Sequence, residues 1–238
     1  MQEAPYSPAT LQRPSRTERE VPLVDGGPAA GTLVLCVGYR GAGFAGFAEQ
    51  PGMRTVAGEL RRALSTVLRR DVELVCAGRT DSGVHALSQY VSVPVSEGEL
   101  AITGRTLSRS LVALTPDDIS IRGLYRGDAL FSARFDATSR SYRYRIAAGD
   151  ARPVLAWDHA WWYRGGLDVA AMQEGAACLV GEHDFKSFCN IRTNTDDTIR
   201  TIYSLDVIRD GEEIKIRVSG NGFLYNMVRI IAGTLIRV

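Results

Sequence analysis

The sequence predicts an α+β fold made of two ferredoxin-like β-α-β-β-α-β halves, the second of which lacks its last strand. Strand patterns and amphipathic helix patterns follow one another in this order, and the series then begins again. The chain has 238 residues, of which 45% are hydrophobic, enough for one large domain or two small ones. We therefore expect one mixed, mostly antiparallel sheet with helices on one face and a central cleft across the other.

The first half is expected over residues 32–128. A buried strand is predicted at residues 33–39, "LVLCVGY". The helix pattern at residues 55–70 places five apolar side chains on one face: Val56, Leu60, Leu64, Val67 and Leu68. Strands at residues 72–78 and 89–95, a helix at 104–114 and a strand at 118–126 complete the order.

The second half is expected over residues 129–238. A strand at residues 140–146 precedes a helix at 168–180, whose inward side chains are Val169, Met172, Ala176 and Leu179. Two strands then flank Asp210-Gly211, a dipeptide typical of tight hairpins. A largely apolar helix at residues 223–238 ends the series. No residue-level repeat accompanies this second β-α-β-β-α pattern.

Residues 1–31 are expected to be a disordered N-terminal tail. Five prolines fall there among polar and charged residues, so the segment buries too little to offset its ordering entropy. The tail lacks the charged and then apolar pattern of a signal peptide, and no apolar run would span a membrane. A reducing, cytoplasmic setting is therefore the expected localisation.

Composition restricts the kinds of site. The cysteines and histidines share no metal-ligand spacing, so neither a zinc site nor a disulfide framework is expected. The formal net charge is only +1, but Lys186 and Lys215 are the only lysines among 28 basic residues. The planar guanidinium suits phosphate and base stacking. A bias in genomic composition would explain the arginines equally well.

The segment "GAGFAG" at residues 41–46 spells G-x-G-x-x-G directly after a strand. In a dinucleotide-binding motif the third glycine would open a helix. Here Pro51 and Gly52 come next, and the helix pattern begins only near Thr55. We therefore interpret this segment as a loop at the rim of the cleft.

The segment "CAGRTDSGVHA" at residues 76–86 holds a single acid, Asp81, between Gly78 and Gly83. On spacing alone, Asp81 is favoured as a turn residue that hydrogen-bonds its own backbone. The functional interpretation is a nucleophilic carboxylate on a rigid loop, kept ionised by a guanidinium such as that of Arg79. A glycosidase is disfavoured because that chemistry needs two carboxylates.

This segment closely resembles the catalytic motif of the tRNA pseudouridine synthase A family. The similarity continues in order through "FSARFDATSRSYRYRI", "LVGEHDFKSFC", "TIRTI" and "GFLYNMVRIIAGTL", and so covers roughly residue 33 to the C-terminus. Several long motifs in the right order are far more specific than one motif. Two segments depart from the family's usual pattern. The first loop has Arg40, Phe47 and Ala48 in place of aspartate, tryptophan and glutamine, and the chain ends at Val238, before the family's closing strand.

The resemblance implies isomerisation of uridine to pseudouridine at positions 38, 39 and 40 of the tRNA anticodon arm. It implies no cofactor and no metal, with tRNA bound in the central cleft of a homodimer. It places the catalytic nucleophile on Asp81, with Arg79 in the same motif and Arg229 as the partner of the aspartate. Tyr142 is implied to bind the target base. The same two side chains, Tyr142 and Arg229, would otherwise be an ordinary strand aromatic and a helix surface residue.

Arginines that line the cleft would hold the RNA backbone, and the candidates are Arg54, Arg105 and Arg109. Two alternatives stay open. A paralogue with the same chemistry could supply pseudouridine for a C-nucleoside product, as the altered first loop suggests. A catalytically impaired RNA-binding protein is the other, as the expected loss of the last strand suggests.

Overall fold

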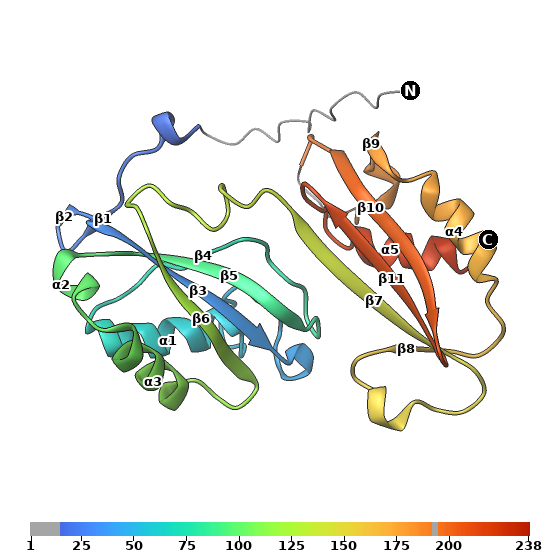
Figure 1. The fold of residues 1–238 in the computed structure, drawn as a ribbon, viewed down its shortest axis with the longest axis horizontal. Coiled ribbons are helices and arrows are strands. Elements are labelled where there is room, and N and C mark those ends of the chain that lie inside the picture. The colour runs from blue at the N-terminus through green and yellow to red at the C-terminus, as the bar shows by residue number, and fades with distance from the viewer. Residues whose placement is uncertain (1–14, 192–194) are drawn as a thin grey trace. The chain divides into compact units, whose positions relative to one another are not determined.

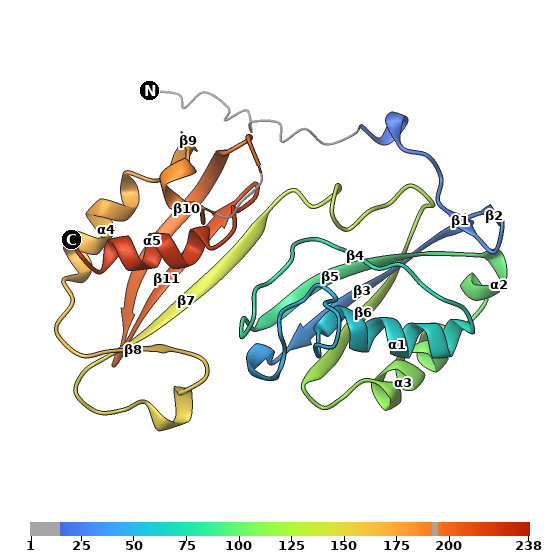
Figure 2. The same cartoon turned by 180° about the vertical axis from the view of Figure 1, so that it is seen from behind.

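A computed structural model describes residues 15–191 and 195–238 of the chain (Figures 1 and 2). It divides into two compact units, Arg13–Ala137 and a second that contains Thr138–Val238. Both units combine helices with sheets, which confirms the predicted α+β class. No helix in the described part of the chain is long and apolar enough to cross a membrane.

The first unit contains a four-stranded antiparallel sheet in the order β4-β5-β3-β6. Its strands are β3 (Gly31–Tyr39), β4 (Val75–Cys76), β5 (Ala86–Val95) and β6 (Ile119–Gly127). The helices α1 (Val56–Leu68) and α3 (Gly104–Leu114) cover one face of this sheet, and the short helix α2 (Glu97–Leu100) comes after β5 (Figures 1 and 2). Within the described residues of this unit, the other face of the sheet carries no helix.

Capping and periodicity explain these helices. The Thr55 hydroxyl accepts a hydrogen bond from the Gly58 N–H and begins α1, and Arg69, with φ of +59°, ends it. The buried face of α1 includes Leu60 and Leu64, as the sequence predicts. These side chains pack on the inward residues of the sheet, which include Leu35, Val37, Val91 and Val93. Burial of this apolar face stabilises the helix in place.

Residues 15–30 carry structure where the sequence favours disorder, while residues 1–14 of that predicted tail lie outside the described residues. Strands β1 (Leu23–Val24) and β2 (Gly27–Pro28) form a small hairpin after a 3₁₀ turn (Arg16–Glu18). The Arg19 guanidinium lies 3.0 Å from the Asp136 carboxylate, and both side chains are largely buried. This ion pair and the burial of Val24 offset part of the ordering entropy.

The segment at residues 128–137 belongs to the first unit rather than to the second. The N–H of Ala133 donates to the Ser92 hydroxyl over 3.0 Å, and Ala133 is buried. This contact ties the segment to β5. The boundary between the units therefore comes after Ala137, nine residues later than the expected end of the first half at residue 128.

The second unit contains a five-stranded sheet in the order β8-β7-β11-β10-β9. Its strands are β7 (Arg140–Ala148), β8 (Trp161–Tyr163), β9 (Gly181–Asp184), β10 (Ile199–Asp210) and β11 (Glu213–Gly220). All pairs are antiparallel except β7 with β8. The hairpin at Asp210-Gly211 is confirmed: Asp210 pairs with Glu213, and Gly211 has φ of +61°.

The helices α4 (Val169–Ala177) and α5 (Met227–Leu235) lie on one face of this sheet (Figures 1 and 2). Met172, Met227 and Ile231 pack there against Ile214 and Ile216. Within the described residues, the two sheets share no strand. The continuous sheet across both halves therefore stays a prediction.

Candidate active site

The loop between β4 and β5 carries the single acid that the sequence selects. The Val84 N–H donates to the Asp81 carbonyl over 3.1 Å, and Gly83 has φ of +77°. The loop therefore turns tightly directly after Asp81, in a conformation that favours glycine. Asp81 is only half-buried in this turn. The turn geometry and the partial exposure of Asp81 thus occur together.

Neighbouring segments hold this loop on both sides of Asp81. The Tyr39 hydroxyl at the end of β3 lies 2.8 Å from the Thr80 hydroxyl. The Phe47 N–H donates to the Thr80 carbonyl over 2.9 Å. The Ser82 hydroxyl donates to the Phe44 carbonyl over 3.3 Å. The residues directly before and after Asp81 are therefore both anchored, which fixes its backbone.

The glycine-rich segment at residues 41–46 packs against this loop. A Cβ on Gly41 would lie 2.0 Å from the Val84 carbonyl oxygen, so only glycine fits there. The Gly41 N–H also donates to Nδ1 of His85 over 3.3 Å. Gly46 has φ of +113°, and a Cβ there would lie 3.0 Å from the Thr80 carbonyl oxygen. Gly41 and Gly46 therefore allow this segment to approach the Asp81 loop closely.

The same glycine-rich segment does not lead directly into a helix. A 3₁₀ turn spans Gly41–Gly43, and α1 begins only at Val56. The third glycine therefore opens no helix, as the sequence predicts, and the dinucleotide interpretation lacks its structural context. Phe47, one of the departures from the family pattern, is buried with its ring centroid 6.2 Å from that of Tyr39.

Arg79 lies on the same loop, two residues before Asp81, and it is exposed. Burial raises the pKa of the Cys76 thiol, and the positive charges of Arg79 and, more weakly, Arg134 oppose that rise. Two guanidinium groups therefore create a positive potential where β4 leads into the loop. Such a potential favours the ionised form of a nearby carboxyl.

Tyr142 lies in the second unit, on β7 opposite Val218 of β11. Its half-buried ring meets that of Phe223 edge to face, with centroids 5.0 Å apart and an interplanar angle of 80°. Edge-to-face pairs of this kind restrict how a ring can turn. Tyr142 is thus oriented by packing, although its strand pattern alone indicates only an ordinary strand aromatic.

Arg229 lies in the first turns of α5, also in the second unit, and it is exposed. Burial raises the pKa of the Tyr144 hydroxyl, and the charge of Arg229 acts in the opposite sense. Arg229 is therefore close enough to interact with Tyr144, two residues after Tyr142 on β7. Of the four predicted site residues, Arg79 and Asp81 lie in the first unit, and Tyr142 and Arg229 lie in the second.

The three arginines that the sequence offers for RNA contacts have different surroundings. Arg54 is held by Asp118 over 2.8 Å and by Glu59 over 3.2 Å, and its guanidinium lies 4.2 Å from the Phe44 ring centroid. Arg105 and Arg109 are exposed on α3, on the helix-covered face of the sheet. Arg54 therefore buttresses the first loop, and the other two lie apart from the sheet face without helices.

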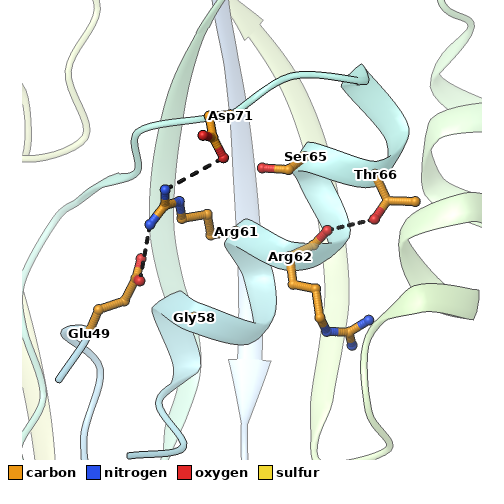
Figure 3. A pocket seen from close by; sticks show the side chains of 7 residues that line it. All are labelled: Glu49, Gly58, Arg61, Arg62, Ser65, Thr66 and Asp71. Carbon is orange, nitrogen blue, oxygen red and sulfur yellow. Dashed lines mark hydrogen bonds and ion pairs between the residues drawn. The ribbon is translucent and has the colours of Figure 1, made fainter. Parts of the chain in front are cut away.

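A surface hollow beside α1 contains none of the predicted site residues (Figure 3). Its lining comprises Glu49, Gly58, Arg61, Arg62, Ser65, Thr66 and Asp71. The Arg61 guanidinium lies between two carboxylates, 3.3 Å from Glu49 and 3.6 Å from Asp71 (Figure 3). Its charge is therefore already offset, which disfavours an anion site here.

Comparison with known proteins identifies the family. The family model described as tRNA pseudouridine synthase matches residues 176–238. A tRNA pseudouridine synthase A from Brevibacillus brevis is 42% identical over 212 residues, which cover 87% of this chain and 83% of the relative. Those from Anoxybacillus flavithermus and Geobacillus kaustophilus are 40% and 38% identical, each covering 85% of this chain and 81% and 78% of the relative. The chain belongs to the tRNA pseudouridine synthase A family.

Proposed function

We propose that this chain isomerises uridine to pseudouridine in tRNA, with the Asp81 carboxylate as its nucleophile. The observation that carries the proposal is the anchoring of the Asp81 loop through Thr80, on which Tyr39 and Phe47 converge. Rigid positioning of an attacking group lowers the entropic part of a reaction barrier. Pseudouridine synthases are isomerases, so the proposed reaction consumes no second substrate.

The reaction balances within the nucleotide itself. The bond between N1 of uracil and C1′ of ribose breaks, the base turns, and a bond forms between C5 and C1′. The proton on C5 is lost, and N1 ends with a proton. The Asp81 carboxylate would act covalently at the sugar or at the pyrimidine ring, and carboxylates are established nucleophiles in other enzymes.

The other site residues have supporting roles in this proposal. Arg229 would pair with the Asp81 carboxylate and orient its oxygens, for which a bidentate guanidinium is well suited. Arg79 would add to the positive potential along the loop. Tyr142, whose ring is oriented by Phe223, would pack on the target base after it leaves its stack.

We further propose uridines 38, 39 and 40 of the anticodon arm as targets, and a homodimer in the cytoplasm as the working form. The printed names of the relatives support tRNA as the substrate class. We also infer that the first unit is ferredoxin-like. Its strand order β4-β5-β3-β6, with α1 and α3 as the connections, supports this inference.

The test is a pseudouridine map of unmodified tRNA transcripts incubated with the purified chain. Carbodiimide adducts on pseudouridine block reverse transcription, so each product gives a stop at a defined position. We expect new stops in the anticodon arm with the natural chain and none with Asp81→Asn. Asp71→Asn is the matched control, because Asp71 is an exposed aspartate in the same unit whose side chain is 91% accessible.

Other results would contradict parts of the proposal. Stops with both the natural chain and Asp81→Asn would exclude Asp81 as the nucleophile. No stops, together with conversion of free uridine nucleotides, would favour the paralogue that supplies pseudouridine for a C-nucleoside product. Tight tRNA binding without any conversion would favour the non-catalytic RNA-binding protein.

A further inference from the structure

Two exposed tyrosines lie on the helix-free face of the four-stranded sheet in the first unit. Tyr90 of β5 is 43% exposed and Tyr125 of β6 is 53% exposed. Inward positions such as Leu35, Val91 and Leu124 face α1 and α3, so Tyr90 and Tyr125 point to the opposite side. Neither ring is part of the hydrophobic core between the sheet and its helices.

The strand register brings both tyrosines around one buried residue of β3. Cys36 pairs with Tyr90 on one side and with Gly123 on the other. A Cβ on Gly123 would lie 2.8 Å from the Tyr125 hydroxyl and 3.0 Å from two ring carbons, so the Tyr125 ring lies across Gly123. The interaction with Cys36, and more weakly that with Tyr125, raises the pKa of Tyr90. The two rings therefore flank Cys36 on a single surface.

The surroundings of these rings are polar or basic. All four strands lie in the described part of the chain, and none of their helix-free positions carries a carboxylate. A Cβ on Gly38 would lie 3.3 Å from Cδ of Arg122, so that guanidinium stem lies over the same face. The positive charges of Arg79 and Arg134 act on Cys76 of β4. The residue after Cys76, Ala77, donates its N–H to the Tyr90 carbonyl, so these charges act on the strand beside Tyr90.

The same face ends at the loop that carries Asp81. A Cβ on Gly38 would lie within 3.4 Å of the carbonyl oxygens of Ala86 and Leu87, the first residues of β5 after that loop. Tyr90 lies three residues further along the same strand. An RNA strand that reaches Asp81 along this face would therefore pass the two tyrosine rings.

We propose that Tyr90 and Tyr125 form a stacking platform for unpaired bases of the RNA next to the target uridine. Sheets with exposed aromatics bind single-stranded RNA in this way, because every base has a face that stacks. The arginines at the edges would hold the phosphates. We favour RNA over a protein partner because Arg122 lies over this face, no described strand position on it carries a carboxylate, and Val34 beside the rings is itself buried. The inference rests on the proposed function in taking RNA as the substrate.

The test compares two double variants of the full chain in titrations with fluorescently labelled RNA. One probe is a stem-loop with a seven-base loop, and the other is the same stem as a closed duplex. We expect Tyr90→Ala/Tyr125→Ala to bind the loop RNA at least about tenfold more weakly, and to bind the duplex as the natural chain does. Tyr90→Phe/Tyr125→Phe keeps both rings and should bind like the natural chain.

Each other result overturns the inference. Unchanged loop binding by the alanine variant would show that the rings do not stack on bases. An equal loss in the phenylalanine variant would show that the hydroxyl groups matter instead. A change of molar mass in light scattering would show that this face contacts a second copy of the chain. If the double variant misfolds, the single variant Tyr125→Ala provides the same test. It should fold, because β6 is an edge strand and the Tyr125 ring is exposed.

The two proposals fail in different ways. If the natural chain binds the loop RNA through the tyrosines but modifies no uridine, the proposed reaction fails and the platform stands. If the chain modifies tRNA and the alanine variant does so with unchanged KM, the platform fails and the reaction stands. If the natural chain binds no unpaired RNA at all, the platform fails.

Discussion

The hydroxyl of Tyr39 lies 2.8 Å from that of Thr80, the residue directly before Asp81. Tyr39 ends the central strand β3 and is 5% exposed, so this contact links the buried sheet to the loop that carries Asp81. The position of the proposed nucleophile thus depends on the core of the first unit. Substitutions of the residues that anchor this loop, such as Tyr39, should therefore lower activity.

Tyr39→Phe removes this hydrogen bond and keeps the ring packed against Phe47. We expect the free energy of unfolding to fall by about 0.5–1.5 kcal/mol, the net value of one such bond. The loss of positioning should lower kcat severalfold with little change in KM. Steady-state kinetics and chemical denaturation would check this, and an unchanged kcat would contradict the anchoring role.

Gly41→Ala should disturb the loop directly, because the new Cβ would lie 2.0 Å from the Val84 carbonyl oxygen. The segment around Gly41 or the Asp81 loop must then move, so we expect a large loss of kcat together with a lower Tm. Gly104→Ala is the control, since a Cβ there meets no atom within 4 Å. That substitution at the start of α3 should leave kcat unchanged and stabilise the chain by roughly 0.4–1 kcal/mol.

Tyr142→Leu removes the ring that is proposed to hold the target base. We expect a loss of base binding of about 1–3 kcal/mol, seen as reduced activity. The lost contact with Phe223 should cost about 0.5–1.5 kcal/mol of stability. Tyr163→Leu is matched, because it removes a comparable edge-to-face contact, with Trp161. Equal losses of activity in the two variants would contradict the special role of Tyr142.

The pair of Glu99 and Arg70 should make stability depend on pH. Burial alone would raise the pKa of Glu99, but hydrogen bonds from Arg70 and from the Ser96 N–H bring it below its usual value of 4.5. A carboxyl with a lowered folded pKa stabilises the folded state above pH 4.5, and this contribution is lost as the pH falls further.

Glu99→Gln should therefore destabilise the chain at pH 7 by about 1–3 kcal/mol, because it leaves the largely buried Arg70 without its charged partner. The difference from the natural chain should shrink in denaturation curves below pH 4.5. Glu97→Gln, in the same helical turn but exposed, should have a smaller effect. A difference that stays constant down to about pH 3 would contradict the ion-pair origin.

Periodicity predicted the long elements of the fold well, because burial of one face determines them. The helix at Gly104–Leu114 agrees with its predicted bounds, and α1 agrees to within two residues. The predicted strand at residues 72–78 is reduced to Val75–Cys76, since an apolar run indicates burial but not ladder pairing. The parallel strand Trp161–Tyr163 had no recognisable pattern in so short a segment.

The site was only partly predictable. Asp81 is an ordinary turn residue by spacing, and its role was predicted from the family's motif. The supporting contacts of Tyr39 and Gly41 join segments about forty residues apart, so no local pattern could reveal them. The exposure of Tyr90 and Tyr125 likewise depends on which sheet face the helices cover. Alternation along a strand cannot determine that choice by itself.

The most direct measurement is release of tritium from tRNA labelled at C5 of uridine, because each isomerisation expels that hydrogen. The natural chain and Asp71→Asn should release tritium at equal rates, while Asp81→Asn should stay at background with unchanged circular dichroism and unchanged tRNA affinity. Release by Asp81→Asn at the natural rate would contradict the assignment of the nucleophile.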